Sequence, residues 1–160
     1  MIDKIISGGQ TGADRAAIDF AIKHNIPYGG WVPKGRKTED GTLPEKYHLQ
    51  EMLTGQYVKR TEKNTLDSDG TLIVSHGLLT GGSALTRELA RQHGKPWIHI
   101  DLEMISCPEA AGMIREWIDR HGIKVMNVAG PRARKDPKIY EAVMDLLEEL
   151  HKTPVFPKGK

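Results

Sequence analysis

Apolar residues along the chain fall into short runs that alternate with stretches of helical spacing. The runs at 2–6, 26–32, 71–74, 96–100 and 124–128 are each a few residues long, which is typical of strands. The run Leu72 to Val74 is bounded by Asp69-Gly70 and by Gly77. A short apolar run between such turn residues suits a strand covered on both faces, so we expect it at the centre of a sheet.

Between these runs, apolar positions recur three and four residues apart and predict helices. The first follows a glycine loop near residue 14, and others cover residues 84–93 and 108–121. Pro108 suits a first helical turn, and Gly94 and Gly122 suit helix ends. The last helix carries a stripe of Ile139, Val143, Leu146, Leu147 and Leu150. We also expect a surface loop over 33–41 and a short helix over 44–54.

Strands that alternate with helices over the whole length predict an α/β fold. Right-handed crossovers place helices on both faces of a parallel sheet. We therefore expect a single-domain Rossmann-like three-layer α/β/α sandwich with a mainly parallel sheet. The domain covers residues 1–151, and residues 152–160, with Pro154 and Pro157, are expected to form a flexible tail.

Composition excludes several classes of protein. The 160 residues are 38% hydrophobic and 28% charged, which fits a globular domain and not a coiled coil or a disordered tail. The longest aliphatic run falls far short of the roughly 20 residues that cross a bilayer. With no signal-peptide pattern at the amino terminus, we expect a cytoplasmic protein without a membrane partner. The formal charge of +2 is too small to drive nucleic-acid binding, and the only cysteine, Cys107, leaves no internal disulfide.

Candidate chemistry lies in three glycine turns that follow predicted strands and open helices. They are Gly8-Gly9-Gln10-Thr11-Gly12, Gly81-Gly82-Ser83, and Ala129-Gly130-Pro131-Arg132. Carboxyl ends of parallel strands share one edge of the sheet, where ligands of such folds bind. Free backbone N–H groups at helix starts favour a phosphate or another oxyanion, although glycine in such turns also serves conformation alone. The spacing matches neither a P-loop nor G-x-G-x-x-G, so neither ordinary ATP hydrolysis nor standard NAD binding is indicated.

Individual side chains near these turns add to the candidate site. Asp14, just inside the first helix, suits ribose hydroxyls or a capping role equally well. Lys34 and Arg36 lie in a loop that either closes over an anion or stays solvated, and Arg132 is the better phosphate ligand. The histidines lack metal-site spacing, so we predict no metal ligands. Cys107 lies at a helix start, where the dipole favours a thiolate, but it has no base partner.

Six segments between residue 5 and about residue 150 carry a resemblance to a known family. They are Gly8 to Ala17, Gly30 to Arg36, Tyr57 to Asn64, Asp69 to Val74, Gly81-Gly82, and Asn127 to Arg132. Together they resemble the YpsA-related branch of the SLOG superfamily, whose members are often named molybdenum carriers. The resemblance implies a Rossmann-like fold related to the lysine-decarboxylase-like LOG phosphoribohydrolases and the DNA-processing DprA proteins. It also implies a nucleotide-like ligand, of which the phosphate-bearing molybdenum cofactor is one.

The phosphoribohydrolases carry an arginine upstream of a P-G-G-x-G-T-x-x-E signature. Laid on that signature, this sequence places Arg60 at the arginine and Glu88 at the glutamate, so the resemblance implies a catalytic pair for N-glycosidic cleavage. Thr80, Ala84 and Leu85 depart from the signature, which puts catalysis in doubt more than anion binding. Glu88 near Arg87 and Arg91 also fits an ordinary surface ion pair.

We therefore expect binding of a phosphate-bearing, nucleotide-like molecule, with Thr86 added to the glycine turns as a ligand residue. Hydrolysis of a nucleotide N-glycosidic bond is the alternative, and nucleic-acid binding is the least favoured reading. The resemblance also implies a homodimer or a higher homo-oligomer, with the apolar stripe of the 108–121 helix as a candidate surface.

Overall fold

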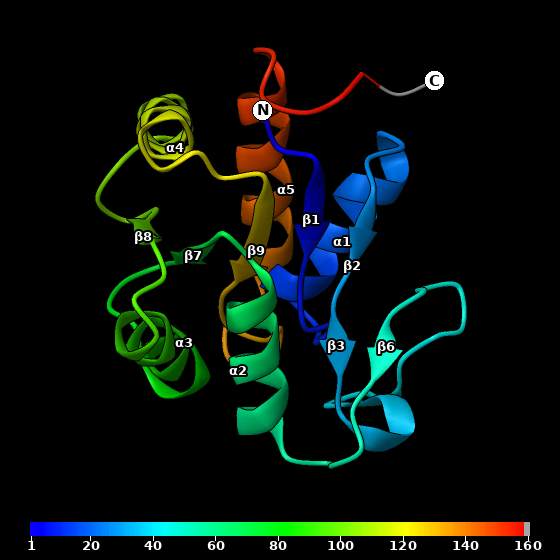
Figure 1. The fold of residues 1–160 in the computed structure, drawn as a ribbon. Coiled ribbons are helices and arrows are strands. Elements are labelled where there is room, and N and C mark those ends of the chain that lie inside the picture. Colours follow the sequence, from blue (N-terminus) through cyan, green and yellow to red (C-terminus); the bar gives the residue numbers. More distant parts are fainter. Residues whose placement is uncertain (159–160) are drawn as a thin grey trace.

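A five-stranded sheet forms the centre of the chain, which a computed structural model describes over residues 1–158 (Figure 1). Its strands are β1 (Lys4–Ile6), β2 (Tyr28–Gly29), β7 (Gly70–Ser75), β8 (Trp97–Asp101) and β9 (Val125–Ala129). They lie in the order β2-β1-β9-β7-β8, and every neighbouring pair is parallel. All six residues of β7 are buried, which confirms a strand covered on both faces, but the centre of the sheet is β9, and β7 lies between β9 and the edge strand β8.

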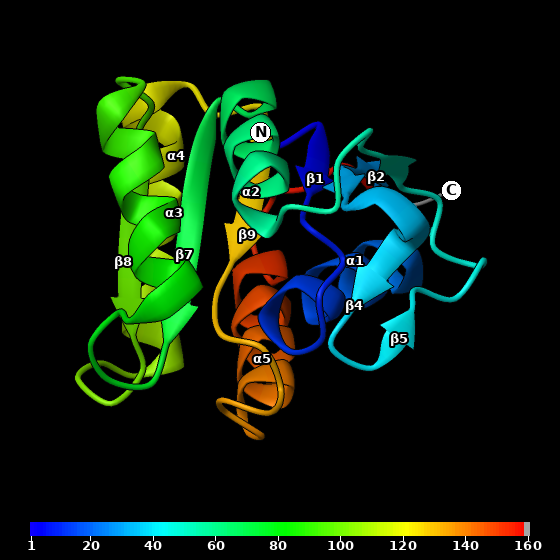
Figure 2. The same ribbon diagram turned by 90° about the horizontal axis from the view of Figure 1, so that it is seen from below.

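Helices cover both faces of this sheet. On one face, α1 (Ala13–Lys23) and α4 (Cys107–His121) pack on either side of α5 (Ile139–His151). On the other face, α2 (Tyr57–Asp67) packs against α3 (Gly81–Gln92) (Figure 2). The fold is therefore the Rossmann-like α/β/α sandwich that the sequence predicts.

The two faces of the sheet differ in polarity. Leu72, Val74, Met126 and Val128 belong to the main apolar core with α1, α4 and α5. Three of the alternate positions carry the polar residues Thr71, Ser75 and Asn127, and the buried side chain of Asn127 donates to the Thr71 hydroxyl at 3.2 Å. Because strand side chains alternate between faces, these polar groups lie toward α2 and α3.

An excursion of residues 30–56 leaves the sheet after β2. It contains β3 (Trp31–Val32) paired with β6 (Gln50–Glu51), a 3-10 turn η1 (Lys34–Arg36), and a hairpin of β4 (Lys37–Thr38) and β5 (Gly41–Thr42). The strand expected over 26–32 is thus split into β2 and β3. Gly30 separates them with a φ of 128°, and a Cβ there would overlap the Ser7 carbonyl.

The prediction of a helix over 44–54 is wrong. The chain instead takes an irregular path in which Leu43, Tyr47 and Leu49 bury themselves with Ile18 and Val32. The Arg36 guanidinium donates to the carbonyl groups of residues 43, 44, 47 and 49, at distances from 2.8 to 3.5 Å. These bonds satisfy backbone acceptors that a helix would otherwise pair internally.

Helix α2 is an element that hydrophobic periodicity does not predict. Its buried residues are Arg60, Asn64 and Thr65, so the face that packs on the sheet is polar. Asn64 accepts a hydrogen bond from the Trp31 backbone N–H at 2.8 Å and donates to the Trp31 carbonyl at 3.1 Å. Hydrogen bonds to the excursion, rather than an apolar stripe, therefore hold this helix.

The carboxyl-terminal segment, expected to be a tail, packs in part against the domain. Val155 and Phe156 are buried, and Ile2 donates its N–H to the Val155 carbonyl at 2.8 Å. The apolar stripe of α4, expected as an oligomer surface, is also covered, because Ala110, Ile114 and Ile118 lie in the main core. Over residues 1–158, none of the helices is both long and apolar enough to cross a membrane.

Gly130, directly after β9, provides a test of how closely β9 approaches β7 and α1. A Cβ there would overlap the Val74 carbonyl oxygen and lie 2.7 Å from the Ala13 Cβ. We expect Gly130→Ala to lower the free energy of unfolding by about 1 to 3 kcal/mol, as overpacking does. Gly112→Ala in α4 is the matched control, since its Cβ would enter open space. Alanine should stabilise that helix by about 0.5 to 1 kcal/mol. Urea denaturation measures both, and equal effects would contradict this packing.

Candidate functional site

A cleft of about 520 Å³ lies beyond the carboxyl ends of β1, β9 and β7. The chain leaves β1 toward β2 on one side and β7 toward β8 on the other, so the order of the sheet reverses here. Ligands of open α/β sheets bind at such a reversal. The lining comes from the glycine loop, α2, the start of α3 and the segment after β9: Gly8, Gln10, Asp14, Tyr57, Val58, Arg60, Thr61, Asn64, Thr80, Gly81, Gly82, Ser83, Leu85, Thr86, Asn127, Val128, Ala129, Gly130, Pro131, Arg132 and Lys135.

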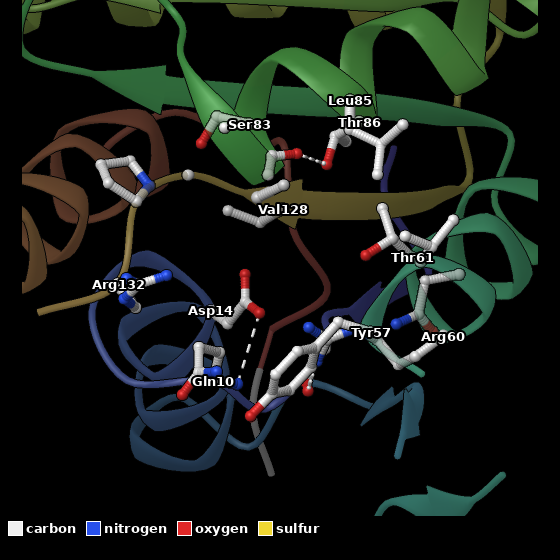
Figure 3. A pocket seen from close by; sticks show the side chains of 18 of the residues that line it. Gln10, Asp14, Tyr57, Arg60, Thr61, Ser83, Leu85, Thr86, Val128 and Arg132 are labelled. Atoms are coloured by element: carbon white, nitrogen blue, oxygen red, sulfur yellow. Dashed lines mark hydrogen bonds between the residues drawn. The ribbon is translucent and has the colours of Figure 1, made fainter. Parts of the chain in front are cut away.

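Asp14 and Arg60 are buried near each other in this cleft, close enough for the charge of each to shift the pKa of the other. In Figure 3 the Asp14 carboxyl group points into the cavity, with Arg132 and Arg60 on opposite sides of it. Burial raises the pKa of Asp14 from 3.8 to about 6, against the opposing attraction of Arg60 and a hydrogen bond from the Gln10 N–H at 3.3 Å. An acid with such a pKa exchanges protons near neutral pH, which is a property of many functional sites.

Arg60 is fixed by the glycine loop. It is 7% exposed and donates a short hydrogen bond to the Gly8 carbonyl. A Cβ on Gly8 would lie 2.8 Å from the Arg60 guanidinium carbon and 2.9 Å from Asp14 Oδ2. Burial lowers the pKa of the Arg60 guanidinium, and Asp14 opposes that shift. Position 8 therefore requires glycine, because the side chains of Arg60 and Asp14 occupy the volume that a Cβ would need.

Positive charge and free amides gather where α3 begins. Gly81, Gly82 and Ser83 line the cleft, and a Cβ on Gly81 would lie 3.0 Å from Lys135 Nζ. Within residues 1–158, the side chain of Thr80 makes no hydrogen bond that caps α3. The first N–H groups of a helix have no partner within the helix, so this end offers donors beside an ammonium group.

An apolar wall faces the polar groups. Tyr57 and Val58 at the start of α2 are 37% and 49% exposed, and Leu85 lies across from them on α3. The Arg60 guanidinium lies 5.4 Å from the centre of the Tyr57 ring. The cleft thus combines hydrogen-bonding groups, positive charge and apolar surface, which is typical of a small-molecule site.

The glycine loop at 8–12 is divided between the cleft and the interior. Gly8 and Gln10 line the cleft, whereas Gly9 faces Val32 and Leu49 of the excursion. Thr11 and Gly12 instead contact the segment after β9, where Ala133 N–H donates to the Thr11 hydroxyl at 3.1 Å. The Ala13 N–H, at the start of α1, donates to the Pro131 carbonyl at 3.2 Å. This helix start is therefore occupied by the chain itself, unlike the start of α3.

Three other predicted site residues lie outside the cleft lining. Lys34 is exposed on η1, and Arg36 holds backbone carbonyl groups of the excursion. Glu88 faces away on α3, where its 43% exposed side chain pairs with Arg91. Arg91 holds the pKa of Glu88 below its usual range. The carboxylate beside Arg60 is thus Asp14 and not Glu88.

Several lining residues were not among the sequence candidates. Those on α2 come from a helix with no apolar stripe, although Tyr57 to Asn64 contribute to the family resemblance. Lys135 lies only three residues beyond Arg132, and its position follows from a turn in which its N–H donates to the Arg132 carbonyl. The position after a strand of the central sheet is a usable signal only for Thr80 and Lys135. The full set of such residues is Tyr57, Val58, Thr61, Asn64, Thr80, Leu85, Asn127, Val128 and Lys135.

Cys107 and His76 lie outside the cleft lining and have structural surroundings. Burial raises the pKa of the Cys107 thiol, with Asp145 and Glu149 adding to the shift, so these surroundings oppose the effect of the helix dipole. His76 Nδ1 lies 2.6 Å from Asp136 Oδ2 and ties the loop after β7 to the loop before α5. Among the described residues, no three His, Cys, Asp or Glu side chains gather as a metal site would require.

Residues 5–151 match the sequence profile of the circularly permutated YpsA SLOG family. The chain is a member of this family. It is also similar to a solved structure from Syntrophus aciditrophicus SB that bears the name "Putative molybdenum carrier protein". The two sequences are 68% identical, the match covers 93% of this chain and 94% of the other, and the TM-score is 0.93. Among curated proteins, none matches this SLOG chain significantly.

The raised pKa of Asp14 gives a pH-dependent prediction. Between about pH 4 and pH 6 the folded chain holds a proton that the unfolded chain releases, so the contribution of Asp14 to stability falls as pH rises through this window. Asp14→Asn removes this titration. The stability of Asp14→Asn relative to wild type should therefore increase by about 2 to 3 kcal/mol from pH 4 to pH 7. Urea unfolding at a series of pH values measures it, and parallel curves would contradict the burial of this carboxylate.

Proposed function

We propose that this SLOG protein binds a phosphate-bearing, nucleotide-like small molecule in the cleft. The observation that carries the proposal is the free amino-terminal end of α3 beside Lys135, in one cavity with the Asp14–Arg60 pair. Backbone N–H groups and an ammonium group favour a phosphate. Asp14 and Asn127 offer hydrogen-bonding groups for ribose hydroxyls, and Tyr57 with Leu85 offers apolar surface for a heterocycle.

The molybdenum cofactor is one ligand of this kind, held as cargo. The name of the similar Syntrophus aciditrophicus protein supports including it among the candidates. Its pterin is a polar heterocycle and its phosphate is an anion, so it presents the two features that the cleft complements. A nucleoside monophosphate presents the same pair of features. Binding measurements with each ligand decide which of the two the protein binds.

Ligand binding is tested by thermal unfolding and calorimetry with AMP, ADP-ribose and molybdenum cofactor. A ligand that binds only the folded chain raises its unfolding temperature. Lys135→Gln should weaken the binding of a phosphate-bearing ligand about tenfold, because a charge-assisted hydrogen bond is lost. Lys138→Gln is the matched control, since Lys138 lies outside the cleft lining in the same segment. Equal affinities of the two variants, or no binding of any of the three ligands by wild type, would refute the proposal.

A second candidate function is hydrolysis of a nucleotide N-glycosidic bond. The observation that favours it is the placement of Asp14, a carboxyl group with a pKa of about 6, beside Arg60 inside the cleft. A carboxyl group with such a pKa can give a proton to a leaving base or take one from water, while an arginine stabilises negative charge. Water would cleave the bond between the base and C1′ of the ribose. The base leaves with a proton, and the hydroxyl group of water remains on C1′ of the released ribose phosphate.

This second function predicts which carboxylate matters. Asp14→Asn should abolish the release of adenine from AMP, because amides do not exchange protons near neutral pH. Glu88→Gln should retain the rate, since Glu88 is exposed and pairs with Arg91 outside the cleft. Chromatography of adenine after incubation with each protein measures both. Binding of AMP by wild type without any adenine release would leave binding as the function and exclude hydrolysis of this nucleotide.

A further inference from the structure

Glu39, in the turn of the β4–β5 hairpin, contacts residues of the glycine loop and of the segment after β9, which no sequence pattern predicts. Its side chain is 8% exposed, although its neighbour Asp40 is 61% exposed. The Glu39 carboxylate lies 3.0 Å from Arg132 Nε and accepts a hydrogen bond from the Arg134 N–H at 3.2 Å. It also accepts a short hydrogen bond from the Thr11 hydroxyl. A surface hairpin thus inserts one carboxylate between the glycine loop and the segment after β9, whose residues Thr11 and Ala133 are 122 positions apart in sequence.

The backbone of Glu39 adds a further link to the glycine loop. Its N–H donates to Gln10 Oε1 at 2.9 Å, and the same oxygen accepts the Thr11 N–H at 3.1 Å. Gln10 and Arg132 both line the cleft, whereas Glu39 does not. Glu39 therefore contacts cleft residues from behind and leaves the cavity open.

Arg132 is the side chain for which this contact matters most. It is 58% exposed, and a long exposed side chain samples many rotamers that ligand binding would have to freeze. Glu39 Oε1 is buried and has no hydrogen-bond partner among residues 1–158, so its contact with Arg132 Nε is an ion pair and not a hydrogen bond. This attraction draws the guanidinium toward Glu39 and leaves its two terminal amino groups able to donate. A planar donor pair of this kind suits phosphate oxygens.

We propose that Glu39 is a positioning residue for anion binding, which holds Arg132 at the cleft for the phosphate of the ligand. This inference rests on the proposed binding function. It also fixes a role for the β4–β5 hairpin, which connects the excursion to the cleft through this one carboxylate and the Gln10 amide.

The sign of one substitution separates positioning from simple charge. A carboxylate close to an anion site repels the anion, so neutralising it would tighten binding if charge alone acted. Positioning predicts the opposite result, because Glu39→Gln releases Arg132. Glu39→Asp gives a second distinction, since it keeps the charge but withdraws the carboxylate by one methylene. Positioning predicts weaker binding for this variant too, whereas charge alone predicts no change.

The experiment measures AMP affinity by calorimetry for wild type, Glu39→Gln, Glu39→Asp, Arg132→Gln and the double variant Glu39→Gln/Arg132→Gln. Each Glu39 variant should bind AMP about tenfold more weakly than wild type. The double variant should bind no more weakly than Arg132→Gln, because the two residues act through one contact. Asp40→Asn is the matched control on the same hairpin and should keep wild-type affinity, since the Asp40–Arg134 pair is exposed.

Each result decides between defined alternatives. Wild-type or tighter binding by Glu39→Gln would overturn the positioning role while leaving the proposed function intact. Additive losses in the double variant would also overturn it, because Glu39 would then act independently of Arg132. Wild type that binds none of AMP, ADP-ribose, molybdenum cofactor and inorganic phosphate would overturn the proposed function itself, and if AMP alone fails, the same variants are compared with the ligand that does bind. Thermal unfolding of every variant shows whether a loss of affinity comes from a loss of fold. If Glu39→Gln does not fold, the AMP affinity of Glu39→Asp decides whether Glu39 positions Arg132.

Discussion

The buried guanidinium of Arg60 is the interaction on which the arrangement of the site depends. It joins α2 to the glycine loop through the Gly8 carbonyl and lies beside the Asp14 carboxyl group of α1. A buried charge of this kind is tolerated only when it is hydrogen-bonded and paired. Gly8 must therefore lack a side chain and Asp14 must stay close, so three separate elements are brought together by one charge.

The apolar pattern of the sequence predicts an element correctly wherever burial of apolar side chains stabilises that element. Strands β7, β8 and β9 and helices α4 and α5 coincide with runs and stripes that are visible in the sequence, and their side chains form the main core. The pattern fails where polar bonds replace that burial. Helix α2 packs through Arg60 and Asn64, and residues 44–54 are shaped by the guanidinium of Arg36. Neither arrangement has a period that a sequence reveals, because each depends on partners far along the chain.

The candidate site divides in the same way. Glycine turns after strands are local features, so the sequence places Gly8, Gly81, Gly82 and Gly130 at one edge of the sheet correctly. Which carboxylate faces Arg60 depends on how α1 and α3 are turned relative to α2, and this is a tertiary property. Glu88 satisfies its charge locally with Arg91, whereas Asp14 is enclosed by the loops around it. Of the two residues that the motif selects by analogy, Arg60 lines the cleft and Glu88 lies outside its lining.

Two of the cations that line the cleft, Arg60 and Arg132, each have a carboxylate nearby. Arg60, Arg132 and Lys135 bring positive charge, and Asp14 and Glu39 offset part of it. A carboxylate beside each arginine lowers the free-energy cost of holding that charge out of water, at the expense of some attraction for an anion. The two carboxylates differ in one respect, because Asp14 has a pKa of about 6 and lies in the cavity itself. A phosphate placed near Asp14 would raise that pKa further, since like charges disfavour ionisation. Binding of a phosphate in this cleft would therefore draw a proton onto Asp14 near neutral pH, which turns its carboxyl group from a repelling charge into a hydrogen-bond donor.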